Sequence, residues 1–276
     1  MYELVTLKSG LKSLRALDNL ETYHPGVGPR AEAQILHVDQ QNLIGRSQAV
    51  SKFVIWDVGL GAAANALTAI QTLQTFGGGA EIELHSFDRT TSALEFAIEN
   101  SAELQYLHDH REILKTLLVE KSVQLSSQNH TKIHWKLHLG DFREQLNSKP
   151  APHAVLYDPY SPMKNPDMWT LDHFQRLRHQ LSDDSPCLLT NYTRSTAVRV
   201  TLLLAGFYVG HGVFIGEKAE TTVASNQLGM LDRPLEKKWL DRVVLSRNSA
   251  PIQMPYVQAM ISEAQLAELR RHPQFA

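Results

Sequence analysis

Residues 52 to 74 have the sequence KFVIWDVGLGAAANALTAIQTLQ, which changes character twice within its length. The run from Lys52 to Val58 is rich in β-branched and aromatic residues, as buried strands are. It stops at Gly59-Leu60-Gly61, and Ala62 to Gln74 then holds helix-forming residues without proline or glycine. The stretch predicts a strand, a glycine turn and a helix, which is the first unit of an α/β fold.

Strand and helix patterns alternate through the following part of the chain. Short apolar or alternating runs predict further strands at 81–87, 132–139, 152–157 and 186–192. Helical spacing predicts two helices within 90–124, one at 167–181 capped by Asn165 and Pro166, and one at 195–205. Residues 207–215 and 219–224 are separated by a short turn, as in an antiparallel hairpin. We expect a Rossmann-like α/β fold with a seven-stranded, mostly parallel sheet and one antiparallel strand at its edge.

Length and composition indicate one globular domain. The chain has 276 residues, a net charge of -2 and 43% hydrophobic residues, enough for one large core. We expect a core at 51–225, an N-terminal extension at 1–50 and a C-terminal extension at 226–276. No apolar run approaches the roughly 20 residues of a membrane span, and no signal core follows Met1. The protein is therefore expected in the cytoplasm.

The sequence gives little indication of metal binding or of nucleic-acid binding. Cys187 is the only cysteine, which excludes an internal disulfide and a cysteine-cluster metal site. The histidines show no third ligand at a recognisable spacing, so we expect no metal site. Near-zero net charge argues against strong non-specific nucleic-acid binding, although basic residues concentrate in the last third of the chain. For any single one of these charges, a solvated surface is the better explanation.

The glycine turn fits two cofactors. As Gly59-x-Gly61-x-x-Ala64 with Asp88 after the next strand, it matches the fingerprint that binds the pyrophosphate and ribose of a dinucleotide. With Asp57 just before the turn, it equally suits S-adenosylmethionine, whose cationic ammonium favours a carboxylate. Both cofactors have a ribose for Asp88. Asp141, at the end of the third strand, is placed to accept from an adenine amino group or is a plain surface acid.

A stiff acid-bearing loop follows the fourth strand. The run Val155 to Tyr157 ends at Asp158, and Pro159, Pro162 and Pro166 follow within eight residues. Each proline restricts its own φ and the conformation of the residue before it. Because loops at the carboxyl ends of parallel strands carry most ligand sites, we expect Asp158 beside the glycine turn. A nicotinamide enzyme does not need this arrangement, which favours a methyl donor.

Four sequence blocks together resemble a known family. They are Asp57-x-Gly59-x-Gly61 through Asn65; Asp158 to Pro162 followed by KNPDMW at 164–169; Tyr192-Thr193, Val198-Arg199 and Ala205-Gly206-Phe207; and Glu217 to Glu220. The pattern resembles the methyltransferase domain of the bacterial enzyme that completes 5-methylaminomethyl-2-thiouridine at the tRNA wobble position, including its stand-alone relatives. Ala63, Leu60, Ala219 and the run Arg194 to Thr196 depart from it.

The resemblance implies a class I S-adenosylmethionine-dependent N-methyltransferase acting on the aminomethyl group of 5-aminomethyl(-2-thio)uridine in tRNA. It implies Asp158 as the catalytic group. It implies cofactor contacts at Asp57, Gly59, Gly61, Asn65, Asp88 and Asp141. Substrate contacts are expected at Pro159, Tyr160, Trp169, Tyr192, Arg199 and Lys218, with the last two on phosphate and the aromatic residues available for stacking. Since no fused flavin domain fits within 276 residues, a separate FAD oxidoreductase is the expected partner.

Two alternatives remain open from the sequence. The first is an NAD(P)-dependent oxidoreductase of Rossmann type, which the glycine pattern alone permits. The second is a methyltransferase-like protein that binds RNA or protein without catalysis, to which Ala63 and Ala219 give some weight. A complete Asn165 to Trp169 block after Asp158 speaks against the second.

Overall fold

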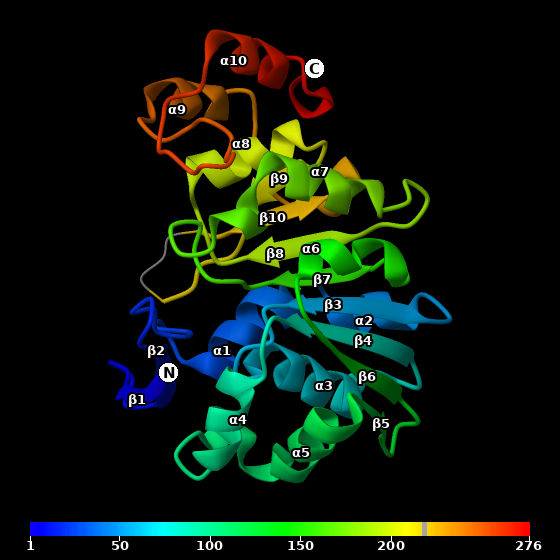
Figure 1. Cartoon of the computed structure of the whole chain (residues 1–276). Coiled ribbons are helices and arrows are strands. Elements are labelled where there is room, and N and C mark those ends of the chain that lie inside the picture. The colour runs from blue at the N-terminus through cyan, green and yellow to red at the C-terminus, as the bar shows by residue number, and fades with distance from the viewer. Residues whose placement is uncertain (217–219) are drawn as a thin grey trace.

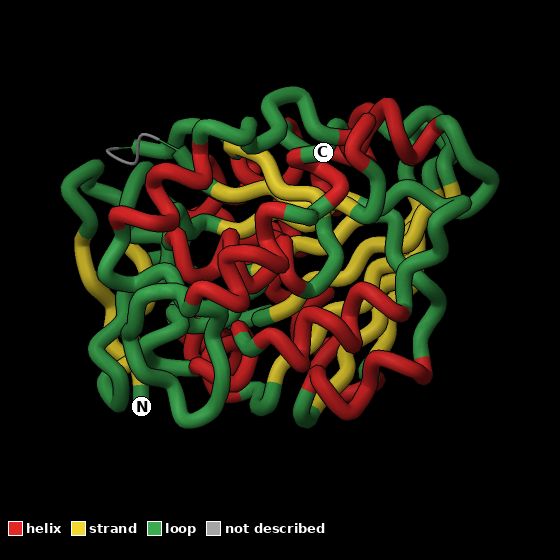
Figure 2. The backbone as a smooth tube through the Cα atoms, turned by 90° about the horizontal axis from the view of Figure 1, so that it is seen from above, coloured by secondary structure: helices red, strands yellow, loops and turns green. Residues whose placement is uncertain are grey.

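The computed structural model describes residues 1–216 and 220–276. Its centre is one eight-stranded sheet, with helices on its two faces (Figure 1). Seen from above, the strands form a continuous layer with helices along it (Figure 2). In spatial order the strands are β5 (Ser122–Ser126), β6 (Lys132–Leu139), β4 (Glu81–Asp88), β3 (Phe53–Val58), β7 (Ala154–Tyr157), β8 (Leu188–Asn191), β10 (Thr222–Ser225) and β9 (Tyr208–His211).

The predicted fold class is confirmed, with corrections at both edges of the sheet. Strands β3, β4, β6, β7 and β8 are parallel, and β10 is antiparallel to β8. The predicted hairpin exists, but β10 lies inside the sheet and β9 forms the edge. At the other edge β5 pairs antiparallel with β6, where the sequence pattern predicted a helix up to Gln124. Helix α5 ends earlier because Lys121 adopts a left-handed φ of 58° and turns the chain.

The helices of the central part connect the parallel strands. They are α3 (Ala64–Phe76), α4 (Ser92–Glu99), α5 (Arg111–Glu120), α6 (Phe142–Gln145), α7 (Leu171–His179) and α8 (Thr196–Leu204), with the 3-10 turns η2 (Gln105–His110), η3 (Leu146–Ser148) and η4 (Pro166–Trp169). The predicted cap of the helix after the Asp158 loop is wrong. Asn165 and Pro166 begin η4, and α7 is capped by Thr170, whose Oγ1 accepts from the amide of His173 at 3.3 Å.

The terminal segments add smaller elements. The N-terminal one holds the hairpin β1 (Tyr2–Thr6) and β2 (Lys12–Ala16), then α1 (Pro29–Ala33), the π-helix η1 (Gln34–Asp39) and α2 (Leu43–Gln48). The C-terminal one holds η5 (Leu228–Met230), α9 (Trp239–Leu245), α10 (Glu263–Arg270) and η6 (Pro273–Phe275). Within the described residues, no helix is both long and apolar enough to cross a bilayer.

Hydrophobic residues of β3 pack into two cores, one on each face of the sheet. Val54 and Trp56 belong to one core, whereas Phe53 and Ile55 belong to the other. This alternation explains why every residue of β3 is buried. Both terminal segments contribute to these cores, for example Leu43 on one side and Trp239 on the other. Packing on both faces therefore fixes the position of the end of β3. The glycine turn that follows β3 lies at the carboxyl edge of the sheet.

Candidate functional site

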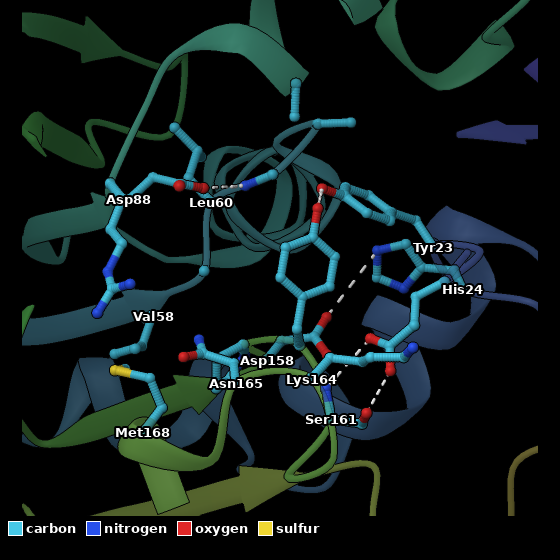
Figure 3. Close-up of a pocket in the computed structure, with 18 of the residues that line it drawn as sticks. Tyr23, His24, Val58, Leu60, Asp88, Asp158, Ser161, Lys164, Asn165 and Met168 are labelled. Atoms are coloured by element: carbon cyan, nitrogen blue, oxygen red, sulfur yellow. Dashed lines mark hydrogen bonds and ion pairs between the residues drawn. The ribbon is translucent and has the colours of Figure 1, made fainter. Parts of the chain in front are cut away.

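A cavity of about 700 Å³ opens at the carboxyl edge of the sheet. Its floor comes from residues at the ends of β3, β4 and β7, among them Gly59, Asp88 and Asp158. Its opposite wall comes from the N-terminal segment, including Tyr23 and His24 (Figure 3). Residues far apart in the sequence thus meet at the predicted end of the sheet.

The glycine turn after β3 is held in a conformation that demands glycine. Gly59 has a φ of +90° and Gly61 a φ of +53°. A Cβ on Gly59 would lie 2.6 Å from the backbone oxygen of Asp158, so the two loops are in direct contact. The amide of Gly61 donates to Asp88 Oδ2 at 2.9 Å. The turn therefore links the ends of β3, β4 and β7 into one rigid floor.

Asp158 presents its carboxylate to the cavity. Its side chain is 19% exposed, and its Oδ2 accepts a hydrogen bond from Asn65 Nδ2 at 2.8 Å. His24 Nε2 lies 4.0 Å from the same oxygen, and the backbone amide of Asp158 donates to the carbonyl of Val58. Asn65 comes from the first turn of α3 and is not among the cavity-lining residues. Its amide orients Asp158 rather than reaching into the cavity.

Three tyrosines enclose the space around Asp158. The hydroxyls of Tyr23 and Tyr160 lie 2.6 Å apart and share one hydrogen bond. Tyr192 donates from its hydroxyl to the carbonyl of Pro159 at 3.2 Å. Burial raises the pKa of Tyr23 and Tyr160, so both phenols stay neutral at physiological pH. All four residues line the cavity, and the substrate contacts expected at Pro159, Tyr160 and Tyr192 stay a prediction.

Two of the predicted acids have distinct surroundings. Asp88 lines the cavity, and burial raises the pKa of its carboxyl while amide donors such as Gly61 lower it. Asp57 lies behind the wall, fully buried, and its Oδ2 accepts from Ser86 Oγ at 2.7 Å. Burial raises the pKa of Asp57 to about 7. Asp57 is not among the residues that line the cavity.

Asp141 is engaged in local contacts. Its Oδ1 accepts from the amide of Arg143 at 3.0 Å and so caps α6, and its Oδ2 accepts from Arg89 at 2.9 Å. Side-chain hydrogen bonds from Arg143 hold the pKa of Asp141 well below its usual range. Its neighbours Gly140 and Phe142 line the cavity, but Asp141 itself does not.

The structure contradicts two predicted substrate contacts. Trp169 is 0% exposed, donates from Nε1 to the carbonyl of Tyr160 at 2.9 Å, and belongs to the core rather than to a stacking surface. Arg199 is also 0% exposed and cannot reach a phosphate. Its Nη1 pairs with Glu220 Oε1 at 2.9 Å, and its Nη2 donates to the carbonyl of Thr221 at 2.8 Å. The third contact, Lys218, lies outside the described residues.

The sequence pattern did not predict that the N-terminal segment forms a wall of the cavity. Glu21 accepts from both the amide and the hydroxyl of Ser161, which ties this wall to the Asp158 loop. Tyr23, His24 and Glu32 also line the cavity. The turn-rich stretch at 23–29 was visible as a candidate loop, but nothing in its spacing indicated which strand end it would cover.

Comparison with known proteins gives consistent matches. A family model described as S-adenosyl-L-methionine-dependent methyltransferase matches residues 104–227. The bifunctional protein MnmC of Leptospira interrogans, named for tRNA 5-methylaminomethyl-2-thiouridine biosynthesis, is 26% identical over 197 residues, which cover 69% of this chain and 30% of that protein. Its namesake from Ralstonia nicotianae is 29% identical over 214 residues, covering 74% and 32%. The chain thus spans about a third of the length of these relatives.

A solved structure agrees along nearly the whole chain. The crystal structure of MNMC2 from Aquifex aeolicus superposes with a TM-score of 0.73 at 25% identity, covering 98% of this chain and 84% of that one. The chain is therefore similar to S-adenosylmethionine-dependent methyltransferases, and the matches support a domain like the methyltransferase domain of MnmC.

Proposed function

We propose that this enzyme methylates a primary amine, the aminomethyl group of 5-aminomethyl(-2-thio)uridine at the wobble position of tRNA. The observation that carries the proposal is the Asp158 carboxylate, held by Asn65 at the cavity wall next to Gly59. The names of the relatives, which refer to 5-methylaminomethyl-2-thiouridine biosynthesis in tRNA, support this acceptor. A tRNA acceptor would place the reaction in the cytoplasm.

The residues at the glycine turn fit S-adenosylmethionine. Gly59 and Gly61 line the cavity and let the Asp158 backbone and the Tyr23 ring approach closely, and Asp88 offers carboxylate oxygens for ribose hydroxyls. When bound, this cofactor supplies an electrophilic methyl group on a cationic sulfur. Asp57 and Asp141 are proposed to support the cofactor site without contacting the cofactor. Asp57 lies beneath the glycine turn and accepts from Ser86, and Asp141 accepts from the amide of Arg143 in the loop that carries Gly140 and Phe142.

Asp158 is proposed to prepare the amine for attack. A primary alkyl ammonium resembles that of a lysine side chain in water, whose pKa is about 10.4, and must lose a proton before its nitrogen has a lone pair. The Asp158 carboxylate can accept a hydrogen bond from that nitrogen, orient it and stabilise the positive charge that forms on it. With its lone pair freed, the nitrogen would be the acceptor of the methyl group, and the protons that it releases would leave to solvent. The Pro159 carbonyl, which accepts from Tyr192, has a second lone pair for another amine hydrogen.

The decisive test measures methyl transfer from S-adenosylmethionine to tRNA that carries the unmethylated aminomethyl group. Asp158→Ala should reduce turnover by about two orders of magnitude while S-adenosylhomocysteine binding survives. Asp184→Ala, an exposed acid in the loop after α7, is the matched control and should behave as wild type. Unchanged turnover in Asp158→Ala would remove the catalytic assignment.

We further propose that a separate FAD oxidoreductase produces the aminomethyl acceptor. Transfer RNA from cells that lack such an oxidoreductase should then be a poor substrate, whereas tRNA treated with it should accept methyl groups. Equal methylation of both tRNA samples would show that this partner is not required.

A nicotinamide oxidoreductase is disfavoured by the electrostatics of the cavity. The Gly61 amide, which a pyrophosphate would need, already donates to Asp88. Carboxylates of Glu21, Glu32 and Asp158 also line the cavity and would repel a phosphate. S-adenosylhomocysteine should therefore raise the melting temperature and NADH should not. Activity in the methyl-transfer assay separates the enzyme from a non-catalytic RNA or protein binder.

A further inference from the structure

We propose that Glu32 is a second recognition carboxylate of the acceptor site, which selects acceptors whose reactive group is a cationic amine. The inference rests on the proposed function and adds the residue that sets its substrate preference. Glu32 lies on α1, in the N-terminal segment, across the cavity from the strand ends.

The surroundings of Glu32 are unusual for a carboxylate. The residue is only 5% exposed, yet it lines the cavity. Among the residues that the structure describes, no side chain donates a hydrogen bond to its carboxylate, and none forms an ion pair with it. Glu21 on the same wall differs, because Ser161 donates to it twice. The Glu32 oxygens are not among the fully buried polar atoms that lack a partner, so they face the cavity, where a ligand can replace the water that reaches them.

The described cations that line the cavity do not pair with Glu32. Arg89 pairs with Asp141, and His24 Nε2 lies toward Asp158 at 4.0 Å. Lys164 is exposed at the cavity rim. Within residues 1–216 and 220–276 no cation is paired with Glu32, so a cationic ligand that enters the cavity would supply its counter-charge.

Glu32 and Asp158 act on the same space. Burial raises the pKa of Tyr192, and the nearby carboxylates of Asp158 and Glu32 are among the charges that raise it further. Glu32, Asp158 and Tyr192 all line the same cavity, so both acids face the space beside this ring. An ammonium group placed beside Tyr192 would meet negative charge from two directions, whereas a neutral hydroxyl would gain little.

A purely structural role for Glu32 makes a different prediction. The residue lies in the first turn of α1, where an acid stabilises the helix dipole. If that were its whole role, substitution would lower thermal stability and leave the choice of acceptor unchanged. The choice of acceptor is therefore the property to measure.

The experiment compares two anticodon stem-loops that differ only at the wobble nucleotide, 5-aminomethyluridine against 5-hydroxymethyluridine. Their affinities are measured on protein loaded with S-adenosylhomocysteine, so no turnover is needed. The wild type should prefer the amine, and Glu32→Gln should lower this preference roughly tenfold to hundredfold, as expected for a lost hydrogen bond to a charged group. Glu32→Asp, which keeps the charge, should retain part of the preference. Glu99→Gln, at an exposed site on α4, is the control and should retain all of it.

Each outcome decides the proposal. A wild-type preference that persists in Glu32→Gln would overturn it, and so would a wild type that binds both stem-loops equally. A methyl-transfer assay on the wild type decides the proposed function separately. An inactive wild type that still prefers the amine through Glu32 would refute the proposed reaction and leave the recognition role standing.

Discussion

Alanine at Gly59 should damage catalysis through the position of Asp158. The ideal Cβ of residue 59 would lie 2.6 Å from the Asp158 carbonyl oxygen and 3.1 Å from Pro159 Cα. A carbon and an oxygen without a bond between them approach to about 3.3 Å, so the Asp158 backbone must retreat by about 0.7 Å. Since a displacement of about 1 Å can cost 100-fold in rate, we expect Gly59→Ala to lose roughly 10- to 100-fold in kcat.

The chain offers a matched control at Gly79. Gly59 has a φ of +90° and Gly79 a φ of +88°, so alanine pays the same backbone strain of about 1–2 kcal/mol at either site. A Cβ on Gly79 would meet only Asn129 O at 3.8 Å, which is an ordinary contact. Gly79 precedes β4 and therefore lies at the amino edge of the sheet, away from the cavity. Gly79→Ala should be destabilised with a kcat close to that of the wild type.

The assay measures kcat on undermodified tRNA below the melting temperature of both variants, with the free energy of unfolding from urea titrations as the correction for stability. If Gly59→Ala displaces Asp158, its kcat should be much lower than that of Gly79→Ala when the two variants are compared at equal fractions of folded protein. Equal kcat values for the two variants would refute it, because backbone strain alone would then explain both.

Two further predictions concern buried charges. Arg199→Met should lower the free energy of unfolding by about 1–3 kcal/mol, because the Thr221 carbonyl and the Thr222 hydroxyl lose their buried donor while Glu220 keeps His211 and Arg242. The exposed Arg194→Met should cost little. A reduced salt slope of tRNA binding in stable Arg199 variants would instead restore the phosphate role. Folded Asp57 keeps its proton up to about pH 7, against an ordinary pKa of 3.8, so its contribution to stability is present in full below pH 3.8 and is lost as the pH rises through 7. Asp57→Asn should therefore flatten the decline in urea stability between about pH 4 and pH 7, and an unchanged decline would show that other groups cause it.

The parallel part of the fold follows from local patterns. Strand β3, its glycine turn and α3 lie where the sequence predicted them, because a β-branched run, two glycines and a proline-free run of helix formers are each strong local signals. Strand β5 was missed because Val123 and Leu125 continue the apolar spacing of α5. Between α5 and β5 only Lys121 adopts the left-handed conformation, and a sequence pattern rarely predicts a single non-glycine residue in this conformation.

The site was predictable on one side only. Asp158 and Gly59 follow adjacent parallel strands, so topology alone places them together. Tyr23 meets Tyr160 across 137 residues of sequence, and no periodic pattern reports such a contact. Trp169 and Arg199 show the converse problem. Their motifs were recognisable, but a motif residue can serve packing as well as binding, and only the burial of the side chain separates the two roles.

The two walls of the cavity have different origins, and this suggests how its specificity is divided. Gly59, Asp88 and Asp158 follow strands of the sheet, so their geometry is tied to the buried core and suits a cofactor that is the same for all acceptors. Tyr23 and Glu32 belong to the N-terminal segment, which contacts the Asp158 loop through hydrogen bonds and a ring contact between Tyr23 and Tyr160. Such contacts can change without repacking β3, β4 or β7. We therefore expect exchanges at 20–32 to alter the choice of acceptor while S-adenosylhomocysteine affinity persists, and substitutions at the glycine turn to affect both.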